Sequence, residues 1–140
     1  MDPEARFSLE RHEGPYDTWP SRSLLLDRGR PTRTRVPGYV LRHQYAVPGG
    51  FLLVTDDDCP FEEMTHFVLV DESLRIRSAR WAGWPYESFL LGRFVRLGDR
   101  EFLAEFGERC HLVVRVAGRG IPYPWPRLQF RWDPKSVGPI

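Results

Sequence analysis

Residues Phe51 to Val70, FLLVTDDDCPFEEMTHFVLV, carry the strongest structural signal in the chain. Two apolar runs, residues 51–54 and 67–70, flank a strongly acidic segment. Short apolar runs bounded by turn-forming residues are typical of buried strands. The pattern therefore predicts a central β-hairpin that concentrates negative charge at its tip. Pro60 also suits the first position of a single helical turn within that tip.

Further short strands are predicted on both sides of this hairpin. Residues 38–47 alternate with a period of two, which is typical of a strand with one packed face, here Tyr39, Leu41, His43, Tyr45 and Val47. Proline interrupts residues 13–22, and residues 28–35 are predicted to form a basic loop around Pro31. The other predicted strands are residues 6–11, 23–27, 74–81, 89–97, 101–106, 110–116 and 127–132.

The last third of the chain has a regular spacing of turn-like triplets, Gly98-Asp99-Arg100 and Gly107-Glu108-Arg109. Such spacing predicts an antiparallel meander. Residues 100–106 also fit a short helix, because Phe102, Leu103 and Phe106 are helix-spaced and Gly107 could cap its end. We favour a strand there, and we expect the proline-rich residues 117–126 to be extended.

Length and composition indicate one all-β domain over residues 1–140, with a short irregular tail from about residue 133. The chain has 140 residues, 14% of them aromatic, and its 13 prolines and 12 glycines favour many short elements over long helices. We expect an antiparallel β-sandwich or an up-and-down β-barrel of about nine or ten strands, with at most one or two helical turns.

Charge and cysteine usage bear on the compartment and on the kinds of partner. The net charge is +1, which is unlike the basic excess of dedicated nucleic-acid binders. We expect no signal peptide and no membrane span, and two cysteines without secretion favour a cytoplasmic protein. Lys135 is the only lysine among 20 basic residues, a bias that points to a GC-rich bacterial genome.

The acidic segment is the first candidate site. Its members are Asp56, Asp57, Asp58, Glu62 and Glu63. The cluster could steer and dock a basic partner protein, or it could be a solvated loop tip with a helix-capping turn. The helix–loop–helix calcium motif requires oxygen ligands at alternating positions and then glycine, and Pro60 and Phe61 break that pattern.

Metal and enzyme sites have weaker support. Cys59, His66, Cys110 and His111 are suitable zinc ligands, but Cys110 and His111 are adjacent on a predicted strand and should face opposite ways. His66 beside the acidic segment could form an acid–base pair, although no nucleophile or phosphate-loop motif accompanies it. We therefore predict no metal, no cofactor and no catalytic residue.

Loop aromatics form the last candidate set. Trp84, Tyr86 and Trp125 lie in proline-rich segments. Large aromatics in such loops could anchor a protein interface, or they could fill the open end of a barrel core. They belong to a larger excess of aromatics that also includes Trp81, Tyr123 and Trp132. Trp19 and the arginines of residues 28–35 could contact a nucleic acid, but the neutral chain favours a solvated loop.

Together these features predict a small cytoplasmic module, resembling an inhibitor or antitoxin in its general properties, that binds another protein. The acidic tip would supply charge, and Trp84, Tyr86 and Trp125 would supply apolar anchors. One alternative is a β-barrel that holds a small apolar ligand. Another is a hydrolase or metal enzyme built on His66 and the acidic segment. Partner identity, oligomeric state and biological process stay open at this stage.

Overall fold

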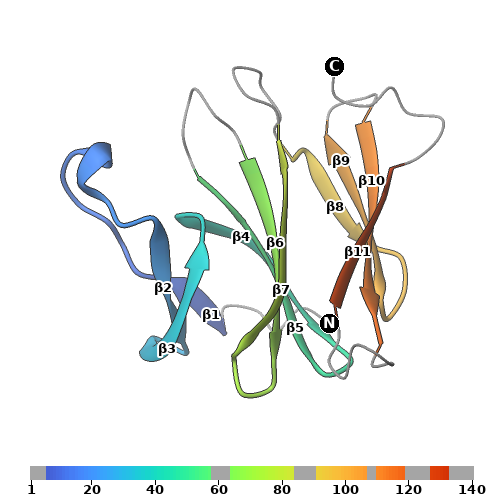
Figure 1. Cartoon of the computed structure of the whole chain (residues 1–140), viewed down its shortest axis with the longest axis horizontal. Coiled ribbons are helices and arrows are strands. Elements are labelled where there is room, and N and C mark those ends of the chain that lie inside the picture. The colour runs from blue at the N-terminus through green and yellow to red at the C-terminus, as the bar shows by residue number, and fades with distance from the viewer. Residues whose placement is uncertain (1–5, 58–63, 84–90, 107–109, 119–126, 133–140) are drawn as a thin grey trace.

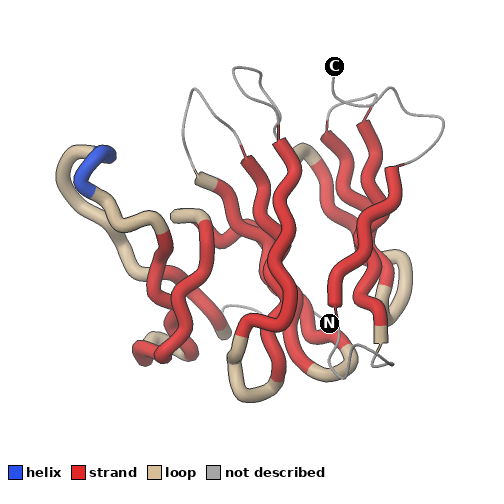
Figure 2. Tube along the Cα trace, viewed as in Figure 1, coloured by secondary structure: helices blue, strands red, loops and turns tan. Residues whose placement is uncertain are grey.

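Three antiparallel sheets contain the eleven strands in the part of the chain that the structure describes, and the only helix there is a short 3-10 helix, η1 (Tyr16–Thr18). The structure is a computed structural model that describes residues 6–57, 64–83, 91–106, 110–118 and 127–132. Within these ranges we find no helix with the length and apolarity needed to cross a membrane. The expected all-β fold is confirmed (Figures 1 and 2).

The N-terminal sheet has the order β1-β2-β3 and consists of β1 (Phe7–Leu9), β2 (Arg22–Asp27) and β3 (Arg30–Pro37). The predicted basic loop over residues 28–35 is wrong, because most of that segment is the edge strand β3. Only Arg28 and Gly29 form the turn, with φ angles of 52° and 80°. Positive φ at both central residues suits the two-residue turns of hairpins. Arginine seldom adopts this conformation, so the sequence does not mark so tight a turn.

The central sheet has the order β4-β5-β6-β7 and contains the predicted hairpin. Its strands are β4 (Val40–Val47), β5 (Gly50–Asp56), β6 (Met64–Asp71) and β7 (Ile76–Gly83). Strands β5 and β6 pair in continuous register, so that Leu52 lies opposite Leu69 and Asp56 lies opposite Thr65. The central hairpin is therefore confirmed, and the acidic segment begins at its end.

Both faces of the central hairpin are buried. Leu52 and Phe67 belong to a core shared with the C-terminal sheet, whereas their neighbours Leu53 and Val68 belong to a core shared with the N-terminal sheet. Successive side chains of a strand point to opposite faces, so a strand covered on both sides reads as an unbroken apolar run. This arrangement explains the two apolar runs of the segment from Phe51 to Val70.

The C-terminal sheet is the predicted meander, in the order β11-β10-β9-β8. Its strands are β8 (Arg93–Arg96), β9 (Glu101–Phe106), β10 (Cys110–Ala117) and β11 (Arg127–Trp132). Residues 101–106 form a strand rather than a helix, with Phe102, Ala104 and Phe106 buried at a period of two. Pairing on both sides of β9, with β8 and β10, stabilises the strand conformation of a segment whose local pattern also fits a helix.

The three sheets stack in layers and do not close into a barrel (Figure 1). In the described ranges each strand pairs only within its own sheet. Side chains link the edges of the central and C-terminal sheets: the Leu128 N–H donates to Ser78 Oγ at 3.1 Å, and Arg96 donates to the Ala46 carbonyl at 2.9 Å. Of the two architectures expected from the sequence, the sandwich-like one is observed and the barrel is not.

A β-bulge divides strand β4 into two parts. The register with β5 shifts between Leu41 and His43. A bulge inserts one residue, so the side chains beyond it change face. Leu41 consequently packs against the core on the N-terminal side, while Tyr45 and Val47 pack against the core on the other side. The prediction that Leu41 and Tyr45 share one face is wrong for this reason.

Candidate functional site

Two of the predicted site residues, Asp56 and Asp57, lie within the described ranges. The other six lie outside them: Asp58, Glu62, Glu63, Trp84, Tyr86 and Trp125. The predicted helical turn at Pro60 and the possible ligand Cys59 also lie outside. The described part of the candidate site therefore consists of the end of β5 and the residues of the central sheet that lie next to that end.

Asp56 is the last residue of β5 and forms an ion pair within its own sheet. Its Oδ2 accepts a hydrogen bond from Arg42 Nε at 2.5 Å. Arg42 lies at the bulge in β4, the strand that pairs with β5. The bulge therefore helps to place a cation next to the first carboxylate of the acidic segment, which offsets part of its negative charge.

Asp57 contacts His66, the residue that the sequence suggests as its acid–base partner. Asp57 Oδ1 and His66 Nε2 are 2.9 Å apart, and the side chains are 23% and 14% exposed. Thr55 and His66 are direct cross-strand partners, so the residue two positions after Thr55 reaches His66 from the end of β5. A carboxylate at this distance fixes the orientation of the imidazole ring.

Tyr39 lies beside this pair. Burial raises the pKa of its phenol, and the negative charge of Asp57 raises that pKa further. The Tyr39 hydroxyl donates a hydrogen bond to the Pro20 carbonyl at 2.7 Å, and its ring packs edge-on against Trp19 and His12 with centroid distances of 5.1 Å. These contacts hold the Tyr39 ring in place.

Trp81 extends the same face of the central sheet. It is the cross-strand partner of His66, and directly opposed residues of antiparallel strands have side chains on one face. Trp81 is nevertheless 57% exposed, so the N-terminal sheet does not cover this part of the central sheet. We use the name Trp81 surface for Tyr39, Asp57, His66 and Trp81.

Sequence reasoning counted Trp81 among the surplus aromatics but did not select it as an anchor. A signal was available, because Ala82 follows it on the same strand and one of two adjacent strand residues must face away from a given core. Ala82 faces the core shared with the C-terminal sheet, which leaves Trp81 on the opposite face. The pattern alone does not show whether another layer covers that face.

A second histidine, His12, hydrogen-bonds to a serine without forming a catalytic pair. His12 Nε2 lies 2.8 Å from Ser23 Oγ, and Ser23 in turn donates to the Gly38 carbonyl at 2.7 Å. The hydroxyl proton of Ser23 is therefore engaged, and His12 Nε2–H is the donor to its oxygen. Ser23 is also completely buried, so it is not available as a nucleophile.

The described residues hold no group of three or more His, Cys, Asp or Glu side chains arranged to bind a metal ion. Cys110 is buried, and burial raises the pKa of its thiol. Its neighbour His111 is partly exposed on the same strand. Raising a thiol pKa disfavours the thiolate that binds metals and attacks electrophiles, so Cys110 acts as part of the core.

Comparisons of the chain with models of protein families, with curated proteins and with solved structures find no match.

Proposed function

We propose that this protein is a binding module that docks another protein on the Trp81 surface. The observation that carries the proposal is the exposure of Trp81 beside the Asp57–His66 pair, with 57% of the tryptophan open to solvent. A strand tryptophan that faces a core would be covered. A large aromatic held on a rigid strand buries much area at little entropic cost when a partner covers it.

The charges beside Trp81 support a basic partner. Arg42 offsets Asp56, and Asp57 is hydrogen-bonded to His66, the cross-strand partner of Trp81. The chain continues with Asp58, Glu62 and Glu63, so the acidic segment adds further negative charge to the sequence after Asp57. Such charge speeds the encounter with a positively charged surface and fixes the register of the complex. An inhibitor or antitoxin that covers a basic surface of its target would use this chemistry.

The composition supports the setting of this proposal. The near absence of lysine favours a bacterial source, and two cysteines favour a reducing compartment. We therefore place the proposed docking in the bacterial cytoplasm.

Two alternative functions have less support. A ligand-holding barrel is not the observed architecture, because the described sheets remain open. A hydrolase built on Asp57 and His66 would need a nucleophile or activated water, and Ser23, which is hydrogen-bonded to His12, is buried. In the proposed function, the hydrogen bond between Asp57 and His66 holds both side chains in place on the Trp81 surface.

Site-specific photo-crosslinking tests the proposal. We expect p-benzoylphenylalanine at position 81 to capture one discrete protein from a lysate of the natural host. Leu97, the residue directly after β8, is 53% exposed, so the same probe at position 97 is a matched control for exposed apolar area. Capture at position 81 should weaken when Asp57→Asn is added, because this change removes the charge and keeps the shape. Equal products from positions 81 and 97, or none from position 81, would reject the proposal.

A further inference from the structure

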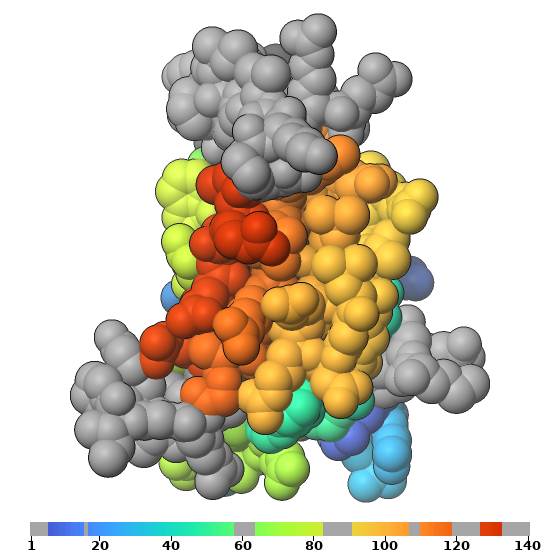
Figure 3. Space-filling view, turned by 90° about the vertical axis from the view of Figure 1, so that its right-hand side faces the viewer, coloured from blue at the N-terminus to red at the C-terminus, as the bar shows by residue number. Residues whose placement is uncertain are grey.

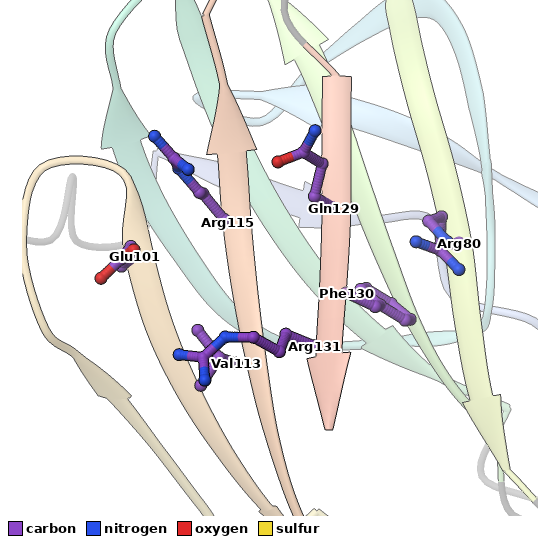
Figure 4. A pocket seen from close by; sticks show the side chains of 7 residues that line it. All are labelled: Arg80, Glu101, Val113, Arg115, Gln129, Phe130 and Arg131. Carbon is purple, nitrogen blue, oxygen red and sulfur yellow. The ribbon is translucent and has the colours of Figure 1, made fainter. Parts of the chain in front are cut away.

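A groove of about 500 Å³ lies at the edge of the C-terminal sheet, away from the Trp81 surface. It is lined by Arg80, Glu101, Val113, Arg115, Gln129, Phe130 and Arg131. Arg115 and Arg131 extend over the outer face of this sheet, and Arg80 approaches from β7 across the edge of β11 (Figure 4). Figure 3 shows that residues of β8 to β11 form this open face of the molecule. Arg80 and Trp81 are adjacent on β7 and point to opposite faces.

The three arginines of the groove have no carboxylate partner within the described ranges. Among the described residues, ion pairs join five other arginines to acidic side chains: Arg6, Arg35, Arg42, Arg77 and Arg93. Within the same part of the chain no ion pair involves Arg80, Arg115 or Arg131. Three guanidinium groups and the single carboxylate of Glu101 give the lining a formal charge of 3 − 1 = +2. An anion would therefore find uncompensated donors in this groove.

Arg80 is held in place by stacking rather than by an ion pair. Its Cζ lies 4.1 Å from the centroid of the Phe130 ring, and Phe130 packs edge-on against Phe67 at 5.3 Å. A guanidinium stacked on a ring keeps its N–H groups directed outward in its own plane. Phe130 therefore positions Arg80 in advance while leaving its donors available, which lowers the entropic cost of binding an anion.

Cross-strand pairing positions the other lining residues. Arg115 lies between Glu101 on β9 and Gln129 on β11, its direct partners in the sheet. Arg131 lies opposite Val113, which is only 9% exposed, and its side chain extends toward that valine (Figure 4). Val113 and the aliphatic part of Arg131 give the groove an apolar floor, and the Gln129 amide adds a neutral donor and acceptor.

An ion pair offsets another arginine of the same sheet. On the same sheet Glu105 offsets Arg93, with 3.6 Å between Oε2 and Nε. The chain as a whole has a net charge of only +1, which is unlike the basic excess of proteins that bind a long phosphate backbone. A volume of about 500 Å³ lies in the range of pockets for small organic ligands.

We propose that this groove binds a small organic molecule carrying two or more oxyanion groups, held by Arg80, Arg115 and Arg131. Carboxylates and phosphates share the planar or tetrahedral oxygens that guanidinium forks bind with paired hydrogen bonds. A ligand with several such groups can engage arginines from three strands at once. This site is independent of the proposed docking on the Trp81 surface.

Isothermal titration calorimetry with citrate and with inorganic pyrophosphate tests the site and distinguishes carboxylate from phosphate ligands. We expect at least one probe to bind, and Arg115→Gln combined with Arg131→Gln to weaken binding about tenfold or more, because each change removes charge-assisted hydrogen bonds. Arg30→Gln combined with Arg33→Gln removes the same charge from exposed positions of β3 and should leave the affinity unchanged. Arg80→Gln should weaken binding without changing the folded circular dichroism spectrum.

Several outcomes would overturn this inference. It is wrong if neither citrate nor pyrophosphate binds. It is also wrong if the β3 control loses as much affinity as the Arg115/Arg131 variant. A polyglutamate peptide or a single-stranded oligonucleotide that binds at least a hundredfold more tightly than both probes, and loses its affinity in the Arg115/Arg131 variant, would assign the groove to a macromolecule instead.

Discussion

Gly50 is a residue at which the central sheet has no room for a side chain. A Cβ built on it would lie 1.9 Å from the carbonyl oxygen of Val70 and 2.8 Å from the Cα of Asp71. Both atoms belong to the backbone of β6, which cannot move without disturbing the pairing of β5 with β6. The close approach of two main chains therefore requires glycine here.

We predict that Gly50→Ala lowers the free energy of unfolding by about 3 kcal/mol, the upper part of the usual range for overpacking. Urea unfolding monitored by tryptophan fluorescence would measure this loss. Gly98→Ala is the control, because no atom lies within 4 Å of a Cβ at Gly98. A Gly50→Ala protein as stable as the Gly98→Ala protein would mean that the two strands are further apart than the structure places them.

Asp71 stabilises the turn between β6 and β7. Burial alone would raise the pKa of its carboxyl, but the N–H of Arg75, the guanidinium of Arg77 and the N–H of Ser73 outweigh burial and hold that pKa below its usual value. These donors bind the ionised form. A carboxyl whose pKa is depressed in the folded state contributes stability above its unfolded pKa, and this contribution is lost as the pH falls through the folded pKa.

We therefore predict that Asp71→Asn costs about 2 kcal/mol at neutral pH, a loss typical of hydrogen bonds to a charged group. The difference between wild type and variant should stay constant down to about pH 5 and shrink below about pH 4, the ordinary pKa of an aspartate. Denaturant unfolding across this range would show the trend, with exposed Glu72→Gln as the control. A difference that grows toward acid pH would contradict the role given to the ionised carboxyl.

At the scale of elements, Gln44 attaches the N-terminal sheet to the central one. It is buried on β4, accepts a hydrogen bond from the Phe7 N–H at 2.9 Å and donates one to the Phe7 carbonyl at 3.1 Å. Strand β1 is at the edge of its sheet, and the Gln44 amide supplies the two hydrogen bonds that a neighbouring strand would otherwise provide. One side chain thus satisfies a buried strand edge.

Gln44→Leu should leave both backbone groups of Phe7 without partners and cost about 2–4 kcal/mol. We expect hydrogen–deuterium exchange to accelerate in β1 and β2 and to change little in β9 and β10, which lie on the far side of the central sheet. Ala46→Ser, at an exposed position of the same strand, is the control. Acceleration spread evenly over all three sheets would show that Gln44 stabilises the whole fold rather than this attachment.

The strands that could be predicted from the sequence are those whose local pattern and tertiary setting agree. Strands β5 and β6 are apolar on both faces, so each is recognisable by itself. Turn-like triplets precede and follow β9, but its local pattern also fits a helix, and its pairing with β8 and β10 decides for the strand. The extent of β3 cannot be predicted in this way, because its arginines and prolines resemble those of a loop. The turn before β3 also depends on Arg28 in a left-handed conformation. The phase of β4 is also missed, because the bulge before His43 has no residue signature.

At the scale of the whole molecule, the layered order decides which residues become a surface. The covering of both faces of β5 and β6 follows from their apolar runs, but the sequence does not show that the third layer stops short of Trp81. The groove is harder still to foresee. The pairing of β10 with β11 brings Arg115 and Arg131 together, and Arg80 joins them because β11 packs beside β7. Their side chains look like ordinary solvated positions of alternating strands.

The two proposed surfaces should act independently, because they lie on opposite sides of one strand. Arg80 and Trp81 are neighbours on β7, yet Arg80 stacks on Phe130 while Trp81 lies beside His66. Once capture at position 81 has identified the docking partner, Trp81→Ala should abolish its binding. The same change should leave citrate or pyrophosphate affinity within about twofold of wild type, because separate sites have additive energies. Arg115→Gln with Arg131→Gln should do the reverse. Titrating the small anion during crosslinking at position 81 completes the measurement: an unchanged yield supports two separate sites, whereas a yield that rises or falls with anion concentration would show that β7 couples them.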